Sequence, residues 1–334
     1  MNYNFIWRRV VYHGLVVLLL FCLCDCSKSK GPLVFVTNER DGTITVIDTA
    51  RDVIVTTFKV GGRLRGIRLA ADKQSVWVAI SYPTNQAQGE DKIAKIDRNG
   101  SVIAKYDAGT DPENFVVNKD ETRLYVANED AGTASVTDIQ ANRVIASMPV
   151  GLEPEGAAMS PDGRWVYITS ESSSTVTVID TRTNQPVKTF LVGARPREAI
   201  FTADGSRAYI SAENGNTVSV VDTTQHSVIK TIEFPRVESM VQLKPKGLAV
   251  SSDGKRVYVT TGRGNSVAVI DGESLTLIQL IPVGQRPWGI ALTADGRKLY
   301  TANGLSNDVS VIDTESNKVI ATIKAGDGPW GIAL

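Results

Sequence analysis

The chain has 334 residues with 36 basic and 36 acidic side chains, so its formal net charge at pH 7 is zero. A balanced charge gives the protein no global field toward nucleic acid or an anionic membrane surface, and we expect no nucleic-acid partner. The sequence holds only two histidines, His13 and His226, which excludes a His-based metal cage and a nucleophile–histidine pair of the hydrolase type.

The N-terminal segment has the pattern of an export signal. Arg8 and Arg9 precede an apolar stretch from Val10 to Leu23, which is too short to span a bilayer comfortably. We therefore assign residues 1–26 to a signal peptide or lipoprotein signal and 27–32 to a short linker. Lipidation of Cys26 and simple cleavage near Ser27 both remain open. Each outcome predicts an exported protein, periplasmic or in the outer envelope, with membrane contact only through this segment.

A short strand that ends in aspartate recurs seven times along the rest of the chain. Successive aspartates are 41 or 42 residues apart, except for two spacings of 49. A repeat of about 40–45 residues is the period of a four-stranded propeller blade. Each period contains four short apolar runs separated by turn residues, as expected for small antiparallel sheets. The repeating aspartates are Asp48, Asp97, Asp138, Asp180, Asp222, Asp271 and Asp313. We interpret them as turn residues that bond the local backbone.

The two ends of the repeat region complement each other. The segment Trp330 to Leu334 reads as a first strand that lacks a second, and Leu33 to Asn38 reads as a second strand that lacks a first. Pairing them would complete the seventh sheet and leave no open edge. We therefore predict an all-β fold, a single seven-bladed β-propeller of four-stranded antiparallel blades over residues 33–334.

Closure also predicts which residues surround one mouth of the axial channel. The corners that enter each innermost strand and the loops between the second and third strands should lie on the same face. By repeat alignment, the corner positions form an inner ring of Arg65, Glu113, Glu155, Arg197, Lys246, Trp288 and Trp330. An outer ring is formed by the residues directly before the corner proline, which is replaced by Leu64 in the first unit: Arg63, Asp111, Glu153, Arg195, Lys244, Arg286 and Gly328. We predict that ligand or partner binding occurs at this mouth.

The mouth carboxylates admit two interpretations. Asp111, Glu113, Glu153 and Glu155 are the oxygen ligands that Ca²⁺ would use, were a metal bound. Neighbouring basic side chains pair with them in the interpretation we favour, a salt-bridged rim without metal. Trp288 and Trp330 are either a binding platform or corner-packing residues. Further carboxylates are expected on loops of the same face, namely Glu39, Glu129, Asp130, Glu171 and Glu213. We expect His226 to be a solvated turn residue.

The blade strands Leu124 to Asn128 and Val257 to Thr261 resemble the YVTN-type β-propeller repeat, a WD40-like seven-bladed architecture. More narrowly, the chain resembles exported propeller proteins associated with PQQ-dependent alcohol catabolism. The matching segments are Asp111 to Glu113, Ala127 to Asp130, Val150 to Gly156, Val283 to Arg286, Asn303 to Val309 and the extended connection from Glu233 to Lys246. The loop from Ser81 to Asp91 departs from that family. The resemblance implies an accessory protein near quinoprotein dehydrogenases and does not imply that this chain binds PQQ.

Three functions follow from these observations. The leading hypothesis is a non-enzymatic binding module or scaffold that holds an exported redox protein, such as a quinoprotein dehydrogenase or cytochrome, or a small ligand. It predicts no catalytic residues and no cofactor. The first alternative is a metal-dependent lactonase-like hydrolase that uses the channel-mouth carboxylates. The second is a cell-surface adhesion or envelope-structural protein.

Overall fold

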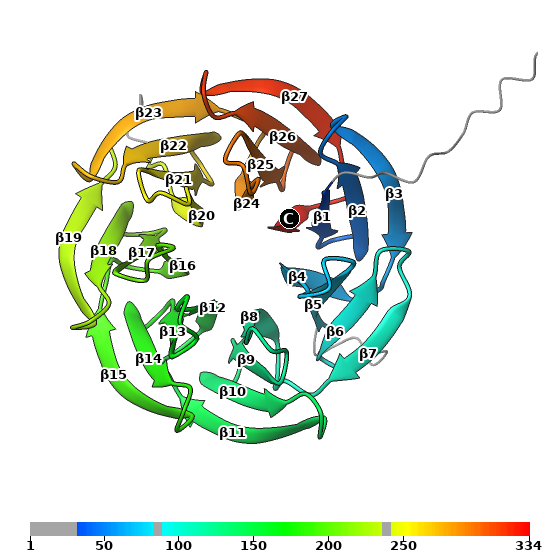
Figure 1. Ribbon diagram of the computed structural model, residues 1–334, viewed down its shortest axis with the longest axis vertical. Coiled ribbons are helices and arrows are strands. Elements are labelled where there is room, and N and C mark those ends of the chain that lie inside the picture. Colours follow the sequence, from blue (N-terminus) through cyan, green and yellow to red (C-terminus); the bar gives the residue numbers. More distant parts are fainter. Residues whose placement is uncertain (1–31, 83–88, 236–241) are drawn as a thin grey trace, which may run out of the picture. The chain divides into compact units, whose positions relative to one another are not determined.

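The computed structural model describes residues 32–82, 89–235 and 242–334. Within these ranges the chain forms 28 β-strands, arranged as seven antiparallel sheets of four strands in a ring (Figure 1). The predicted all-β, seven-bladed propeller is therefore confirmed. No helix in the described part of the chain is long and apolar enough to cross a membrane. The predicted signal and linker segments, including Cys26, lie outside the described residues except for Pro32.

The strands are named by their place in the blades, counting from the channel outward. The innermost strands are β28 (Pro329–Ala333), β4 (Arg63–Leu69), β8 (Pro112–Val117), β12 (Pro154–Met159), β16 (Pro196–Phe201), β20 (Pro245–Val250) and β24 (Pro287–Leu292). The second strands are β1 (Leu33–Asn38), β5 (Ser75–Ser81), β9 (Arg123–Asn128), β13 (Trp165–Ser170), β17 (Arg207–Ala212), β21 (Arg256–Thr261) and β25 (Lys298–Asn303). The third strands are β2 (Thr43–Asp48), β6 (Lys92–Asp97), β10 (Thr133–Asp138), β14 (Thr175–Asp180), β18 (Thr217–Asp222), β22 (Ser266–Asp271) and β26 (Asp308–Asp313). The outermost strands are β3 (Val53–Lys59), β7 (Val102–Tyr106), β11 (Arg143–Pro149), β15 (Gln185–Leu191), β19 (Ser227–Glu233), β23 (Thr276–Pro282) and β27 (Lys318–Lys324). We number the blades from 1, which contains β28 and β1, to 7, which contains β24.

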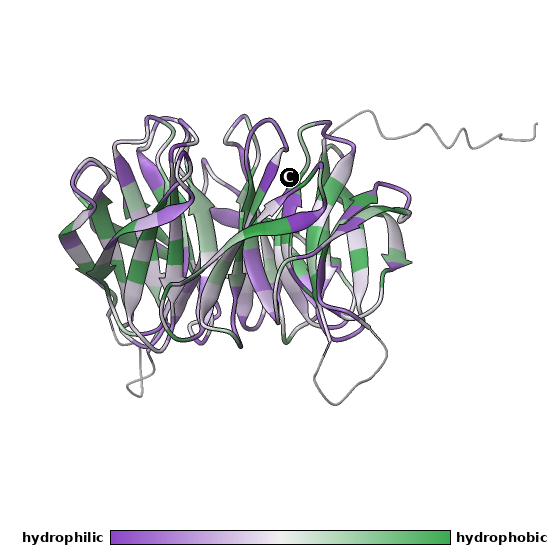
Figure 2. Ribbon diagram, turned by 90° about the horizontal axis from the view of Figure 1, so that it is seen from below, coloured by the Kyte–Doolittle hydropathy of each residue, from purple (hydrophilic) through white to green (hydrophobic). Residues whose placement is uncertain are grey.

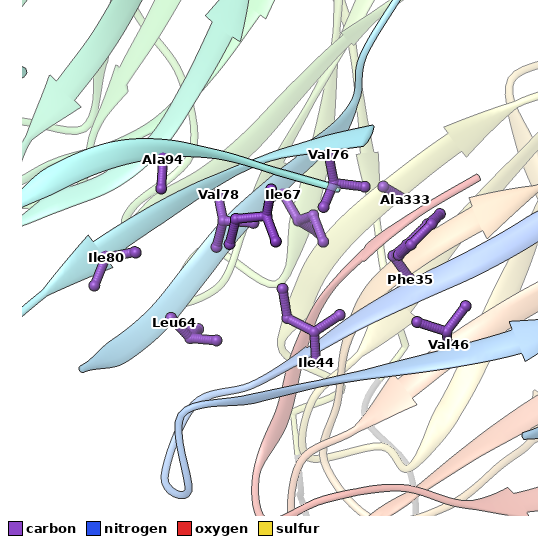
Figure 3. Close-up of a cluster of buried hydrophobic side chains, with 11 residues drawn as sticks. Phe35, Ile44, Val46, Leu64, Ile67, Val76, Val78, Ile80, Ala94 and Ala333 are labelled. Atoms are coloured by element: carbon purple, nitrogen blue, oxygen red, sulfur yellow. The ribbon is translucent and has the colours of Figure 1, made fainter. Parts of the chain in front are cut away.

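The ring closes as the sequence predicts, by pairing the C-terminal strand with the N-terminal one. Strand β28 runs antiparallel to β1, with Ala333 opposite Phe35 and Ile332 opposite Val36. Figure 3 shows Phe35 and Ala333 in one buried cluster with the blade 2 side chains Leu64, Ile67 and Val76. Closure therefore joins the last strand to the apolar contact between blades 1 and 2.

The second and third strands are buried on both faces, because each blade packs against a neighbour on either side. Figure 2 shows hydrophobic residues along the strands and hydrophilic residues concentrated in the loops at both edges of the ring. The outermost strands are largely exposed. The repeating aspartates act in turns as expected: Asp180 Oδ1 accepts a hydrogen bond from the backbone N–H of Arg182 at 2.9 Å.

Tyrosines in the second strands reach across to the neighbouring blade. The hydroxyl of Tyr167 lies 2.7 Å from Nδ1 of His226, which belongs to the turn before the outermost strand of the next blade. His226 also contacts Trp165 edge-on, with ring centroids 4.8 Å apart, and is only 8% exposed. The expectation of a solvated His226 is therefore wrong, because the residue fills the junction between blades 4 and 5.

Candidate functional site at the channel mouth

The inner ring sits where seven corners turn into the innermost strands. Five of the outer-ring residues precede a corner proline and adopt a left-handed backbone, with φ values between 46° and 63°: Asp111, Glu153, Arg195, Lys244 and Arg286. This conformation is costly for residues other than glycine and is often kept at functional sites. The sharp corners point consecutive side chains toward one mouth, as the repeat alignment predicts.

The charged side chains of the inner ring are almost completely buried. Glu113, Glu155, Arg197 and Lys246 expose 0%, 4%, 6% and 3% of their surface. Charged residues are almost never so buried unless they are paired. The mouth is therefore an interlocked layer of ion pairs, and the pairing falls into two clusters.

The first cluster joins blades 1, 2 and 3. Arg63 Nη2 lies 3.0 Å from Asp111 Oδ1 and 3.1 Å from Glu113 Oε1. Arg65 pairs with Glu113 through Nη1 and with Glu39 through Nε, the latter at 3.0 Å. Burial and the neighbouring Glu155 carboxylate raise the pKa of Glu113, against the opposing charge of Arg65.

This cluster contains the oxygen atoms best placed for a metal ion. Single carboxylate oxygens of Asp111, Glu113 and Glu129 lie within 4.8 Å of one another. However, the guanidinium groups of Arg63 and Arg65 already contact two of these three carboxylates. A divalent cation would have to displace them, so the residues fit an arginine-paired cluster better than a Ca²⁺ cage.

The second cluster joins blades 4, 5 and 6. Arg197 pairs with Glu155 at 2.7 Å and also with Glu171. Lys246 Nζ lies 2.9 Å from Glu213 Oε2, and Arg197 Nε lies 3.7 Å from the same oxygen. Burial and the nearby Arg197 charge lower the pKa of Lys246 to about 6, although Glu213 opposes them. Burial raises the pKa of Glu213, but Lys246 and Arg197 outweigh it and lower the pKa overall.

An aromatic pair completes the ring on blades 7 and 1. The rings of Trp288 and Trp330 are stacked with centroids 6.0 Å apart. Lys246 Nζ lies 3.4 Å from the Trp288 ring centroid, and Arg286 lies over the same ring at 5.2 Å. Both tryptophans are half-buried, so each packs in the corner and also presents surface at the mouth.

Two glycines make room for these large side chains. On blades 1, 3, 4 and 5 the residue after the second strand is a glutamate, whereas blades 6 and 7 have Gly262 and Gly304. A Cβ atom at Gly262 would lie 2.5 Å from Lys246 Cε, and one at Gly304 would lie 2.8 Å from Trp288 Cδ1. Blades 1, 3, 4 and 5 therefore place a carboxylate at this position of the mouth, whereas blades 6 and 7 have a glycine there, beside Lys246 and Trp288.

A cavity of about 70 Å³ lies in the channel beneath the inner ring. Its wall includes Glu155, Arg197, Lys246 and both tryptophans. Deeper in the channel, Arg68 of blade 2 and Glu198 of blade 5 approach across the axis, with Nη2 and Oε1 3.9 Å apart. A single water needs about 10–15 Å³ of such space, so the cavity has room for several waters.

The structure brings most of the predicted mouth residues into contact but divides them between the two clusters. Glu153 takes no part in the grouping around Asp111 and Glu113 and accepts a hydrogen bond from Ser172 instead. Glu155 pairs with Arg197, and Glu129 takes its place near Asp111 and Glu113. Sequence reasoning missed Arg68 and Glu198, because a register shift near the start of the innermost strands breaks the simple inward–outward alternation.

Comparison with known proteins gives a family match over part of the chain. Residues 183–325, less than half of the chain, match the model of the family described as lactonase, 7-bladed beta-propeller. This span contains Arg197, Glu213, Lys246 and Trp288. No curated protein matches the chain by sequence.

Solved structures share the fold at low sequence identity. A protein from Bacteroides uniformis assigned as a 6-phosphogluconolactonase has a TM-score of 0.74 and 16% identity, covering 90% of this chain and 98% of its own. Hydrazine synthase of Kuenenia stuttgartiensis has a TM-score of 0.75 and 19% identity, covering 86% and 94%. The dihydro-heme d1 dehydrogenase NirN has a TM-score of 0.66 and 16% identity, covering 90% and 74%.

These findings correct the leading functional hypothesis. The match of residues 183–325 to the lactonase family favours the hydrolase alternative over a non-enzymatic scaffold for PQQ-dependent oxidation.

Proposed function

We propose that the protein is a lactonase-like hydrolase whose chemistry takes place at Lys246. The observation that carries the proposal is the environment of this side chain: it is buried at the channel mouth, faces a cavity and has a pKa lowered to about 6. A lysine with such a pKa is a neutral amine at pH 7 and can act as a general base. It also lies within the span that matches the lactonase family.

The neighbouring groups suit ester chemistry. In the proposed step, Lys246 accepts a proton from a cavity water while the water oxygen forms a bond to the lactone carbonyl carbon. The ring C–O bond then breaks, and the proton passes to the departing alkoxide, which gives a hydroxy acid. Arg197, which lies near Lys246, supplies positive charge for the tetrahedral oxyanion. Glu213 holds the amine in position through its 2.9 Å contact.

The residues that line the cavity indicate where the substrate binds. Lys246 and Arg197 form part of its wall, so the attacking water and the reacting carbonyl lie there. Trp288 and Trp330 line the same cavity and offer aromatic surface to the rest of the substrate.

The experiment is an assay of lactone hydrolysis by proton release, with glucono-δ-lactone, γ-butyrolactone and dihydrocoumarin as substrates. We expect K246R to lose at least about 100-fold in rate, the usual contribution of a general base, although arginine still places a hydrogen-bond donor beside Glu213. K230M, on the exposed outermost strand β19, is the matched control and should retain full activity. Absence of hydrolysis with all three lactones, or an active K246R, would overturn the proposal.

The proposal includes export of the enzyme. Its support is the sequence pattern of residues 1–26 alone, with Cys26 as the site of any lipid anchor. Fractionation of cells that express the full chain would test it, and recovery only in the cytoplasm would contradict it.

A further inference from the structure

Five second strands carry a tyrosine at equivalent positions, and three of these side chains meet a polar turn residue of the next blade. Tyr258 makes no hydrogen bond to the Oδ1 atom of Asn317, the residue opposite it, and Tyr209 has no acceptor opposite it at all. The other three hydrogen-bond or contact the left-handed residue of the turn in the next blade: Tyr125 donates to Asn184 Oδ1 at 2.9 Å, Tyr300 donates to Asp52 Oδ1 at 2.6 Å, and Tyr167 meets His226. In each pair the turn residue lies four positions after a repeating aspartate and offers a side-chain acceptor.

Between blades 5 and 6 the acceptor is missing. Repeat alignment places Leu275 opposite Tyr209, and an alkyl side chain cannot accept a hydrogen bond. Tyr209 is fully buried, and its hydroxyl makes no hydrogen bond within the described part of the chain. Arg207 approaches closely enough to oppose the burial that raises the pKa of Tyr209, but its geometry does not satisfy the oxygen. An unsatisfied buried polar group costs stability and calls for an explanation.

The turn that faces Tyr209 is itself strained. Leu275 keeps the left-handed backbone, with φ of 57°, although this conformation is unfavourable for a large apolar residue. The turn therefore keeps the repeat's backbone but lacks the side-chain acceptor that Asn184, Asp52 and His226 supply at other junctions.

A cavity of about 270 Å³ lies at this junction, and Tyr209 forms part of its wall. Its other charged residues are of both signs: Arg207 and Lys255 are basic, and Asp204, Asp253 and Glu273 are acidic. None of these residues belongs to the channel mouth.

The mixture of groups selects one ligand chemistry. Tyr209, Arg207 and Lys255 donate hydrogen bonds, whereas the three carboxylates accept them. A simple anion would meet three acidic groups and a simple cation would meet two basic ones. A ligand rich in hydroxyl groups both donates and accepts, so it satisfies both kinds of residue.

We propose that this cavity is a binding site for a neutral polyol or a single sugar unit, with Tyr209 as the donor that the ligand satisfies. The site is independent of hydrolysis at the channel mouth.

The test uses saturation-transfer NMR to measure binding of four probes to the full-length protein: D-glucose, D-galactose, myo-inositol and glycerol. The key variant is L275N, which supplies the acceptor that Asn184 supplies to Tyr125. We expect at least one probe to bind the wild type, and we expect L275N to lose that binding while its melting temperature rises. Y209F should also lose binding, and Y167F, at the neighbouring junction, should keep it.

Each other outcome overturns the proposal. Absence of transfer to all four probes would show that the cavity takes no polyol. Binding that survives in both L275N and Y209F would place the sugar elsewhere. Competition by sodium acetate for the same resonances would show an anion site instead.

Discussion

The contact between Tyr167 and His226 ties blade 4 to blade 5, with the hydroxyl 2.7 Å from Nδ1. Burial, together with the positive charges of Lys188 and Arg164, lowers the pKa of His226 in the folded protein. The unfolded chain therefore binds a proton at His226 more readily than the native one does.

This linkage predicts a pH effect on stability. The contribution of His226 is complete above its unfolded pKa of about 6.5 and is lost as pH falls through the lower folded value. We expect the free energy of unfolding to drop between pH 7 and pH 5, and the drop to be smaller in H226N. Urea titrations at several pH values measure it, and an equal drop in both proteins would contradict the linkage.

The tyrosine contact itself should be measurable. Y167F leaves a buried imidazole nitrogen without its partner, so we expect it to cost about 1–2 kcal/mol. Y209F removes a hydroxyl that has no partner and should be neutral or slightly stabilising. Equal destabilisation of the two variants in urea unfolding would show that the hydroxyls do not differ in this way.

The buried amine predicts the pH profile of hydrolysis. Because the pKa of Lys246 is lowered to about 6, the rate should rise as pH increases through 6 and then level off, as the ammonium loses its proton. A stopped-flow pH-jump series with the best lactone measures the profile. A rate that does not change between pH 5 and pH 8 would rule out Lys246 as the base.

The arginine pairs predict the response to metal removal. Arg63 and Arg65 already contact Asp111 and Glu113, so dialysis against EDTA should leave the melting temperature and activity unchanged. Added CaCl₂ should stabilise R63M more than the wild type, because that variant frees one carboxylate. Wild-type protein that melts several degrees lower after EDTA would instead favour the metal-dependent mechanism.

Ring closure predicts the effect of a C-terminal truncation. Deleting residues 329–334 removes β28 and exposes the inner edge of β1, where Phe35 and Val36 pair with it. We expect the cooperative unfolding transition to be lost, whereas deletion of Leu334 alone should have little effect. Differential scanning calorimetry compares the two, and a truncated protein that melts like the wild type would refute this role for β28.

The repeat and its closure were determined by the sequence, because alternating apolar strands, turn residues and a fixed period are local properties. Complementary strands at the two ends were enough to predict that Leu33 to Asn38 and Trp330 to Leu334 share a sheet, as observed. The same alignment predicted which residues surround the mouth, since corresponding corners of a ring must lie on one face.

Only the tertiary structure decided how those residues pair and what remains unpaired. Arg68 and Glu198 meet across the channel although 130 residues separate them, and a local pattern carries no information about such an approach. His226 is buried because the preceding blade presents Trp165 and Tyr167 to it, not because of its own turn. Likewise, Leu275 is an ordinary residue in the sequence, and only the packing of blade 5 against blade 6 leaves the Tyr209 hydroxyl without an acceptor.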